Sequence, residues 1–443
     1  MFRIQPYLES EKYVKFNLIS PILLPANGDT QEKEGYTFKL MDRDNFYDWY
    51  NAFFRVDYKF EATANGGNVV ADTESAPING SFSLIKSLRV NSSGKELYYA
   101  NNIHKFIFIK NLLEFSDDFS RSVAKDQFWY LDIDATTATD ANATNNGIQS
   151  RALLSHGGKM VQTTIPLNRY SFFEGLSDRL LPPMQLEFLI TLQNDRELIW
   201  QNDGRARRIV VRKLELWVPQ LHFTGKGQTF VNENFLKPTQ WKYLKENIFS
   251  LSERRDESGM FMIGSGIKNP KHVFVFFQQA RKINRYTQNP YIFDTFDIDG
   301  DASAKLKTCS LQCGTNFYPQ IEYDNEFKLR ILKDLINFRY RKNDYNTGVQ
   351  IQVENFEKLY PIIYFDLRNA KESLTGDPQI LYFHYKLNEP ANAQDYKIFA
   401  AVLNEQEFVL KQIGNELVVV YKKLKKKILN IIYTHDEHNL SSI

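Results

Sequence analysis

Two cysteines and three aspartates have the spacing that most resembles a chemical site. Cys309 and Cys313 lie four positions apart, which places both side chains on one face of a strand. No second Cys or His pair follows at zinc-site spacing, so we expect two small buried side chains, although the thiols could meet in a helix or turn. Asp297, Asp299 and Asp301 resemble a calcium loop, but a glycine separates the last two and no glutamate closes the loop. This pattern favours a solvated loop over a metal site.

Other residue types capable of catalysis occur without a recognisable arrangement. The glycine turns at 225–227 and 264–266 lack the Gly-Lys-Ser or Gly-Lys-Thr ending of a phosphate-binding loop. The seven histidines show no distinctive spacing to a Ser or Cys nucleophile, although a triad assembled in space would leave no such trace. The sequence therefore predicts no catalytic, cofactor-binding or metal-binding residues, and we expect no enzyme activity and no cofactor.

Composition predicts a folded protein with two cores. The 443 residues are roughly two to three times a typical domain length. The 34 Phe and 24 Tyr residues favour half-buried pleated surfaces over long helices. Because 55 Lys and Arg residues face 53 Asp and Glu residues, no global positive field would hold nucleic acid. An all-β protein with only local nucleic-acid contacts is the expectation.

The cellular compartment is predicted from the cysteines and from hydropathy. Two cysteines are too few for a disulfide scaffold and fit assembly in a reducing compartment. The first residues contain no apolar signal core and no glycine after Met1, so we expect neither secretion nor myristoylation. No stretch approaches the ~20 apolar residues of a transmembrane helix. We expect a soluble chain without a transmembrane segment.

Alternating apolar residues predict long strands in the first half. Every second residue is apolar from 50 to 60, and the polar residues Asn51, Arg55, Asp57 and Lys59 lie on the other face. The same alternation recurs at 82–90, at 186–192 and at 210–218. A turn cluster at Asn91–Gly94 joins the second of these segments to 95–98 and predicts a hairpin. Several strands of this kind favour a sandwich or a barrel.

Two segments interrupt the strand pattern. Between Ile103 and Phe119 the apolar residues follow helical spacing, with Asn101 or Asn102 placed to cap the helix. The loop from Asp132 to Gly147 is polar and nearly free of large apolar groups. A loop that can bury nothing should project into solvent, so we expect an exposed excursion there.

The second half is also predicted to be rich in strands. A polar stretch from about Thr224 to Pro270 has few periodic signals and is interpreted as the junction between two domains, residues 1–225 and 226–443. Apolar or alternating segments follow at 273–277, 362–367, 381–387, 398–403, 408–410 and 417–421.

A second amphipathic helix, at 327–338, repeats the first. It ends Leu-Lys-Asp-Leu-Ile-Asn-Phe, and the first ends Ile-Lys-Asn-Leu-Leu-Glu-Phe, an offset of 223 positions between Phe115 and Phe338. Two short amphipathic helices can agree by chance. Because each lies among strands at the same point of its half, internal duplication is favoured. The expected fold is all-β with short inserted helices, in two tandem antiparallel β-sandwiches.

This plan resembles the double jelly-roll capsid proteins, in which each sandwich has jelly-roll topology. Residues 80–119, followed by Phe128–Asp132, are similar to the strand, turn, helix and aromatic-acid segment in capsid proteins of Polinton or Maverick elements and of adintoviruses. Residues 165–199 and 208–222 are similar to the end of their first roll. The likeness covers most of residues 40–225, and the second half by its general plan.

The resemblance implies a structural role. Three copies would form a trimer of pseudo-sixfold shape, which tiles an icosahedral shell together with neighbouring capsomers and with penton and minor capsid proteins. The protein would be made inside the host cell, in cytoplasm or nucleus, and would reside in the virion capsid. Side-by-side sandwiches with few free edges are physically suited to such assembly.

The resemblance implies a binding function for a lysine cluster near the end of the sequence. It comprises Lys422, Lys423, Lys425, Lys426 and Lys427. At the inner face of a shell these side chains would make weak, salt-dependent contacts with packaged DNA or an inner membrane. A solvated helix face with Leu424 and Ile428 packed inward explains the same pattern.

Two alternatives to a shell protein are open. A double jelly roll can scaffold membrane assembly and then be discarded, and sequence does not distinguish that role from a shell. A β-sandwich carbohydrate-binding protein or glycosidase would use exposed aromatic rings or two facing carboxylates, and no such carboxylate pair is visible in the sequence.

Overall fold

The strands of the first half follow the predicted alternation of apolar residues. The computed structural model describes residues 8–17, 19, 33–42, 44–62, 75–134, 145–177, 179–201, 207–235, 239–251, 258–279, 283, 285, 288–293, 306–324, 328–339, 349–387, 396–413 and 416–421. The first strands are β1 (Leu8–Asn17), β2 (Lys33–Leu40), β3 (Phe46–Tyr47), β4 (Phe53–Ala62), β5 (Ser75–Pro77), β6 (Ile85–Ser92), β7 (Lys95–Asn101), β8 (Met160–Pro166), β9 (Leu186–Leu192), β10 (Ile199–Gln201) and β11 (Arg207–Phe223).

These strands form two antiparallel sheets that face each other. One has the order β1-β11-β4-β8, with β3 paired to β11, and the other has the order β2-β9-β6-β7; β5 and β10 pair separately. In β4 the inward residues, such as Phe54 and Val56, are buried, whereas Phe53 and Arg55 on the outer face are partly exposed. The chain alternates between the sheets in the manner of a jelly roll, which we call the first roll.

The second half repeats the order of the two four-stranded sheets. Its strands are β12 (Thr239–Ser250), β13 (Ser258–Ile267), β14 (Pro270–Gln279), β15 (Leu306–Cys313), β16 (Asn316–Asp324), β17 (Ile363–Asp366), β18 (Gln379–Leu387), β19 (Tyr396–Ile413) and β20 (Glu416–Tyr421). The sheet orders are β12-β19-β14-β17, with β20 beside β19, and β13-β18-β15-β16. These strands form the second roll, and the fold is therefore a double jelly roll, as predicted.

Helices lie between the strands at equivalent places. They are α1 (His104–Glu114), α2 (Asp117–Arg121), α3 (Asn146–Ser155), α4 (Ser171–Glu174), α5 (Gly225–Phe235), α6 (Lys328–Ile336), α7 (Val353–Phe356) and α8 (Lys371–Thr375). In the first roll α1 follows β7, and in the second α6 follows the corresponding strand β16. This equivalence agrees with the internal duplication inferred from the repeated helix sequence.

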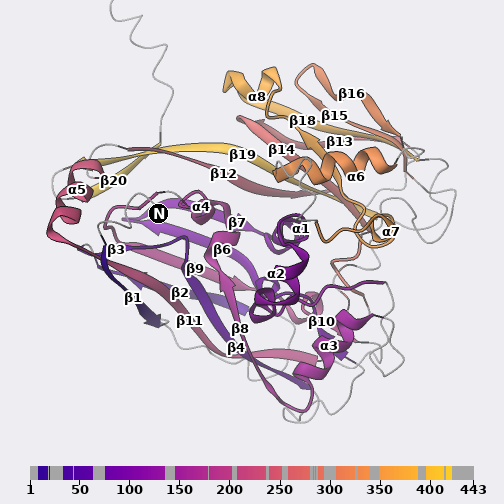
Figure 1. Ribbon diagram of the computed structural model, residues 1–443. Helices are drawn as coiled ribbons and strands as arrows, with labels where there is room; N and C mark the ends of the chain where they lie inside the picture. The colour runs from indigo at the N-terminus through magenta and orange to yellow at the C-terminus, as the bar shows by residue number, and fades with distance from the viewer. Residues whose placement is uncertain are drawn as a thin grey trace, which may run out of the picture.

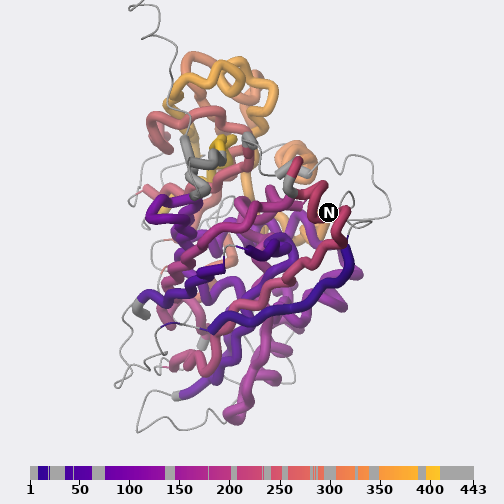
Figure 2. The backbone as a smooth tube through the Cα atoms, turned by 90° about the vertical axis from the view of Figure 1, so that its left-hand side faces the viewer, coloured from indigo at the N-terminus to yellow at the C-terminus, as the bar shows by residue number. Residues whose placement is uncertain are grey.

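The two rolls pack directly against each other. Figure 1 shows β12 and β19 of the second roll lying over the side of the first roll that carries β7 and α4. Figure 2 shows the orange and yellow second roll above the indigo and magenta first roll. Most buried apolar side chains of both rolls form one continuous core, and Phe46, Leu180, Leu221 and Val231 form a small separate cluster. No helix within the described ranges is long and apolar enough to span a membrane.

The hairpin predicted around Asn91–Gly94 is confirmed. Strands β6 and β7 pair through Ser92 and Lys95, and the turn residues Ser93 and Gly94 have φ values of 47° and 75°. Positive φ at both turn positions matches the twist of the flanking strands, and glycine adopts it without steric cost.

Several local predictions were wrong. The stretch from Thr224 to Pro270 is not an irregular junction, because it contains α5, β12 and β13. Residues 398–403 and 408–410 belong to one long strand, β19, rather than two. The segment 82–90 begins with a 3₁₀ turn at Ser81–Leu84 before β6. The N-cap of α1 is Ile103, without a side-chain cap, and Asn102 instead adopts a left-handed φ of 52°.

Candidate functional site: the interface between the two rolls

Helix α1 is the centre of the contact between the rolls. From His104 to Leu113 every residue is buried, including two lysines and an asparagine. The ring of Phe108 stacks on Tyr291 with centroids 4.4 Å apart, and Phe106 lies 5.6 Å from Phe274 of β14. Because rings from both halves meet on this one helix, α1 belongs to the cores of both rolls.

The sheet that receives α1 is covered on both faces. Residues Val273–Phe277 of β14 are at most 1% exposed. Phe277 packs against Phe383 of the facing sheet, whereas Phe274 packs against Phe106 of the first roll. A strand buried on both faces needs a continuous apolar run rather than alternation, which explains the sequence Val-Phe-Val-Phe-Phe.

A buried ion pair ties the ends of the 132–147 loop into this interface. Arg151 of α3, 0% exposed, donates hydrogen bonds to both carboxylate oxygens of Asp132, at 2.9 and 3.2 Å, and to the carbonyl oxygens of Pro77 and Tyr130. Asn145 Nδ2 donates to Asp132 Oδ1 at 3.0 Å. Both charges and their hydrogen-bonding capacity are therefore satisfied inside the protein.

The second roll completes this network. Asn289 Nδ2 donates to Asp132 Oδ2 at 2.8 Å, and the Tyr360 hydroxyl donates to the Asp132 carbonyl oxygen at 2.6 Å. The expectation that Asp132–Gly147 is an exposed excursion is therefore wrong at both ends, while residues 135–144 lie outside the described residues. Gly147 packs so closely on the Leu131 carbonyl that an added Cβ would lie 2.2 Å from its oxygen.

A second polar contact lies where β12 crosses the edge strand β7. Glu246 of β12 accepts hydrogen bonds at one oxygen, Oε1, from the Tyr98 hydroxyl and from the Ser171 backbone N–H, the latter at 3.2 Å. Its other oxygen is buried without a hydrogen-bond partner among the described residues. The Tyr243 hydroxyl, also on β12, donates to the Leu97 carbonyl at 3.1 Å.

Burial makes Glu246 a predicted source of pH dependence. Desolvation raises its pKa above the ordinary 4.5, although the hydrogen bonds from Ser171 and Tyr98 oppose the shift. A carboxyl with a higher pKa in the folded state stabilises the fold while it is protonated, and this contribution is lost as pH rises from 4.5 through the folded pKa. Glu246→Gln, which stays neutral, should therefore gain stability relative to wild type as pH rises, by about 1.4 kcal/mol for each unit of raised pKa.

Denaturant unfolding of both proteins at a series of pH values above 4.5 measures this difference. Because every other acid is shared, the comparison isolates Glu246. A stability difference that is constant across the series would show that Glu246 is ionised in the folded protein, contrary to the structure.

Two basic residues of α1, His104 and Lys105, are buried at the same interface. The Lys105 ammonium donates to Gln278 Oε1 of β14 at 2.9 Å and lies 4.9 Å from the Phe399 ring centre. Burial lowers the pKa of Lys105, and burial together with Lys105 and Lys86 lowers the pKa of His104 well below its ordinary value. Separating the rolls would remove the Gln278 partner of Lys105, so the interface favours one fixed arrangement.

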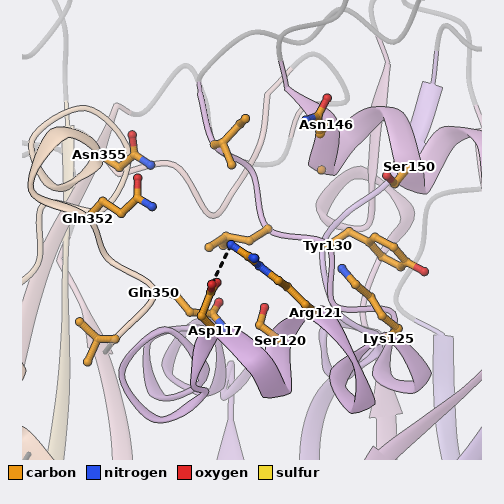
Figure 3. A pocket seen from close by; sticks show the side chains of 14 residues that line it. Asp117, Ser120, Arg121, Lys125, Tyr130, Asn146, Ser150, Gln350, Gln352 and Asn355 are labelled. Atoms are coloured by element: carbon orange, nitrogen blue, oxygen red, sulfur yellow. Dashed lines mark ion pairs between the residues drawn. The ribbon is translucent and has the colours of Figure 1, made fainter. Parts of the chain in front are cut away.

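A polar pocket of about 510 Å³ opens beside the interface (Figure 3). It is lined by Asp117, Ser120, Arg121, Lys125, Tyr130, Leu131, Ile133, Asn146, Gly147, Ser150, Val349, Gln350, Gln352 and Asn355. Asp117 is the one carboxylate of this lining, and its Oδ2 lies 2.7 Å from an Arg121 guanidinium nitrogen. The lining therefore does not supply the facing pair of carboxylates that a glycosidase requires.

The residues singled out in the sequence do not gather at one place. Cys309 and Cys313 are both buried in β15, as predicted, and burial raises the pKa of the Cys313 thiol to about 12. A thiol with so high a pKa is a poor nucleophile. The aspartates at 297, 299 and 301 and the lysines at 422, 423, 425, 426 and 427 lie outside the described residues. Within the described ranges, no three His, Cys, Asp or Glu side chains cluster to hold a metal.

Comparison with known proteins relates the whole fold to viral shells. No protein-family model and no curated protein matches the sequence. Among solved structures, a chain of the Sputnik virophage matches 96% of this chain and 91% of its own length, with a TM-score of 0.60 and 10% identity. The PBCV-1 virus capsid gives 0.55, 10% identity and coverages of 94% and 98%. The mavirus major capsid protein gives 0.53, 10% identity and coverages of 93% and 90%.

Proposed function

We propose that this chain is a major capsid protein, and that its trimers form pseudo-hexameric capsomers of an icosahedral shell. The observation that carries the proposal is that both rolls, together and in the same relative arrangement, match the viral capsid chains over nearly the whole length. A likeness confined to one sandwich would be shared with many unrelated proteins. The paired arrangement is far more restrictive.

The interface between the rolls supports this role physically. A chain whose two similar rolls are held rigidly side by side presents two equivalent lobes, so three chains can form a ring of six. Such a ring fits a hexagonal lattice while needing only threefold symmetry. In this proposal the two domains are residues 1–225 and 226–443. This division is supported by the sheets, because every described strand pair lies within one roll.

The finer assignments belong to the same proposal. Residues 80–119 and 165–199 support kinship with the capsid proteins of Polinton or Maverick elements and adintoviruses. The protein would assemble inside the host cell, in cytoplasm or nucleus, and occupy the virion capsid beside neighbouring capsomers, pentons and minor capsid proteins. Lys422–Lys427 would meet packaged DNA or an inner membrane.

A transient scaffold would have the same fold and the same trimer. Peptide mass spectrometry of purified mature particles separates the two roles, because a shell subunit stays in the particle as an abundant component and a scaffold is lost. We expect the chain in mature particles, and its absence from them would favour the scaffold.

The mass of the purified protein in solution is the first test of the proposal. Size-exclusion chromatography with light scattering should give three times the chain mass of 51.9 kDa. The rolls should not dissociate from one another, since buried hydrogen bonds, such as those from Asn289 and Tyr360 to Asp132, and stacked rings cross their interface. A species that stays monomeric at every accessible concentration would contradict the proposed function.

A further inference from the structure

Equivalent surfaces of the two rolls are covered to very different extents. The 223-position offset between the repeated helices relates Phe106 to Leu329 and Tyr98 to Ile321. Phe106 and Tyr98 are 1% and 0% exposed, whereas Leu329 and Ile321 are 53% and 75% exposed. Large apolar side chains on a protein surface mark contact sites when their equivalents elsewhere are buried. The second roll therefore carries an uncovered copy of a surface that is covered in the first.

We call these surfaces the helix sides of the rolls. The helix side of the first roll consists of edge strand β7 and helix α1, and that of the second consists of edge strand β16 and helix α6. Figure 1 shows β16 at the outer end of the second roll, whereas α6 lies on the side of the second roll nearer to α1. An edge strand offers unpaired backbone groups and needs a cover. Strand β12 contacts β7 through Glu246 and Tyr243, whereas no strand within the described ranges lies beyond the free edge of β16, where Arg330 donates to the Ile321 and Glu322 carbonyl oxygens.

The helix side of the first roll is covered by one face of a second-roll sheet. Tyr98 hydrogen-bonds Glu246 of β12, and Phe106 packs against Phe274 of β14. Both receiving residues lie on the outer face of the sheet β12-β19-β14-β17. By topology, the corresponding sheet of the first roll is β1-β11-β4-β8.

The outer face of that first-roll sheet is accessible and partly aromatic. Figure 1 places β1, β4 and β11 on the side of the first roll away from the second roll. Tyr13, which is 48% exposed, lies 5.9 Å from the partly exposed ring of Phe53, and the register places Trp217 opposite Phe53. The outer face of the first-roll sheet therefore has a partly exposed aromatic patch. The corresponding patch on the second-roll sheet is apolar and fully buried.

We propose that the helix side of the second roll docks on the outer face of β1-β11-β4-β8 in a second copy of the chain. Ile321 and Leu329 would then be covered between chains as Tyr98 and Phe106 are covered within one. The inference rests on the proposed function, because it names the surfaces that build the trimer. Each copy offers one helix side and one sheet face, so the contact is head-to-tail; with threefold rotation between copies it closes into a ring.

Both surfaces carry charged side chains beside their apolar ones. On the receiving face Glu215 is shared by Lys15, Arg55 and Lys213, at 3.3, 3.9 and 3.8 Å. On the docking side Glu322 is exposed, and Arg330 of α6 donates to the carbonyl oxygens of Ile321 and Glu322, so this side carries both signs of charge. A receiving face that is charged rather than uniformly apolar also keeps a free chain soluble before it meets another copy.

The test combines a charge substitution with a matched control. Ile321→Glu with Leu329→Glu should raise the protein concentration needed for half-maximal trimerisation by more than about tenfold, because the new carboxylates would be buried. Met260→Glu is the control, since Met260 is 52% exposed on β13, at the opposite edge of the same sheet from β16. Light scattering over a concentration series gives the masses, and circular dichroism confirms that each variant is folded.

A photo-crosslinking amino acid at position 321 identifies the receiving surface. The expected crosslinks join different chains and map by mass spectrometry to β4 or β11, whereas the same probe at position 260 should not reach them. Trimers of the double variant at wild-type concentrations, or crosslinks from 321 to another surface, would overturn this inference and leave the proposed function intact. A wild-type chain that never forms trimers would overturn both.

Discussion

Replacing Asp132 with alanine is expected to lower the free energy of unfolding by about 3–5 kcal/mol, the usual cost of removing one partner of a buried ion pair. The reason is that Arg151 is 0% exposed and would keep its charge without a carboxylate. Asn145 and Asn289 would each lose a hydrogen bond in the same place. Denaturant unfolding monitored by tryptophan fluorescence measures the change.

Asp117→Ala is the matched control for this substitution. Asp117 also pairs with an arginine, Arg121, but the two side chains are 68% and 77% exposed. Exposed pairs contribute less than about 1 kcal/mol, so this variant should unfold almost as the wild type does. If both variants lost the same small amount of stability, the buried hydrogen-bond network of Asp132 would not stabilise the fold as we expect.

Replacing Phe108 with alanine is expected to lower the free energy of unfolding by about 3–5 kcal/mol, because a buried ring is lost and a cavity remains. Phe108 is 1% exposed and contacts rings of both rolls, among them Trp129 at 5.6 Å and Tyr360 at 5.7 Å. Equilibrium unfolding should show a loss of stability in both rolls together, because α1 contributes to both cores.

Phe108→Leu is the control, because leucine fills part of the space and should cost clearly less than alanine. Limited proteolysis tests the coupling between the rolls. In the alanine variant we expect cleavage within both rolls to become faster. Accelerated cleavage in the first roll alone would contradict the shared core.

The elements best predicted from the sequence were strands that are buried on one face. Alternation located β9 at Leu186–Leu192 with its bounds correct, because each second residue packs into one sandwich. It missed β12, whose buried residues Trp241, Tyr243 and Glu246 contact the first roll rather than a regular core face. Alternating apolar residues indicate a strand that packs on a neighbouring sheet of its own domain. The pattern is weak in a strand whose side chains are buried by a second domain.

The interface network could not be predicted for a related reason. Asp132 lies 13 residues from Asn145 but 157 from Asn289 and 228 from Tyr360 in sequence. The polar composition of 132–147 predicted an exposed loop, yet its terminal polar residues Asp132 and Asn145 are buried and hydrogen-bonded to one another. Composition reveals the polarity of a segment, and only the fold reveals which polar groups satisfy each other.

The repeated helix carried more information than either domain alone. The match between the helix ends predicted a duplication, and the sheet orders show two rolls with the same topology. The same offset also locates the uncovered residues Ile321 and Leu329, which no motif in the sequence marks. Duplication followed by divergence of the exposed surfaces explains how one contact can serve within a chain and, in our proposal, between chains.

Negative-stain electron microscopy of the purified protein tests the central claim most directly. If three chains, each with two equivalent rolls, form a capsomer, class averages should show particles of threefold symmetry with six lobes and a hexagonal outline. Particles with two lobes, or twofold dimers without a ring, would contradict the account of this chain as a capsid subunit.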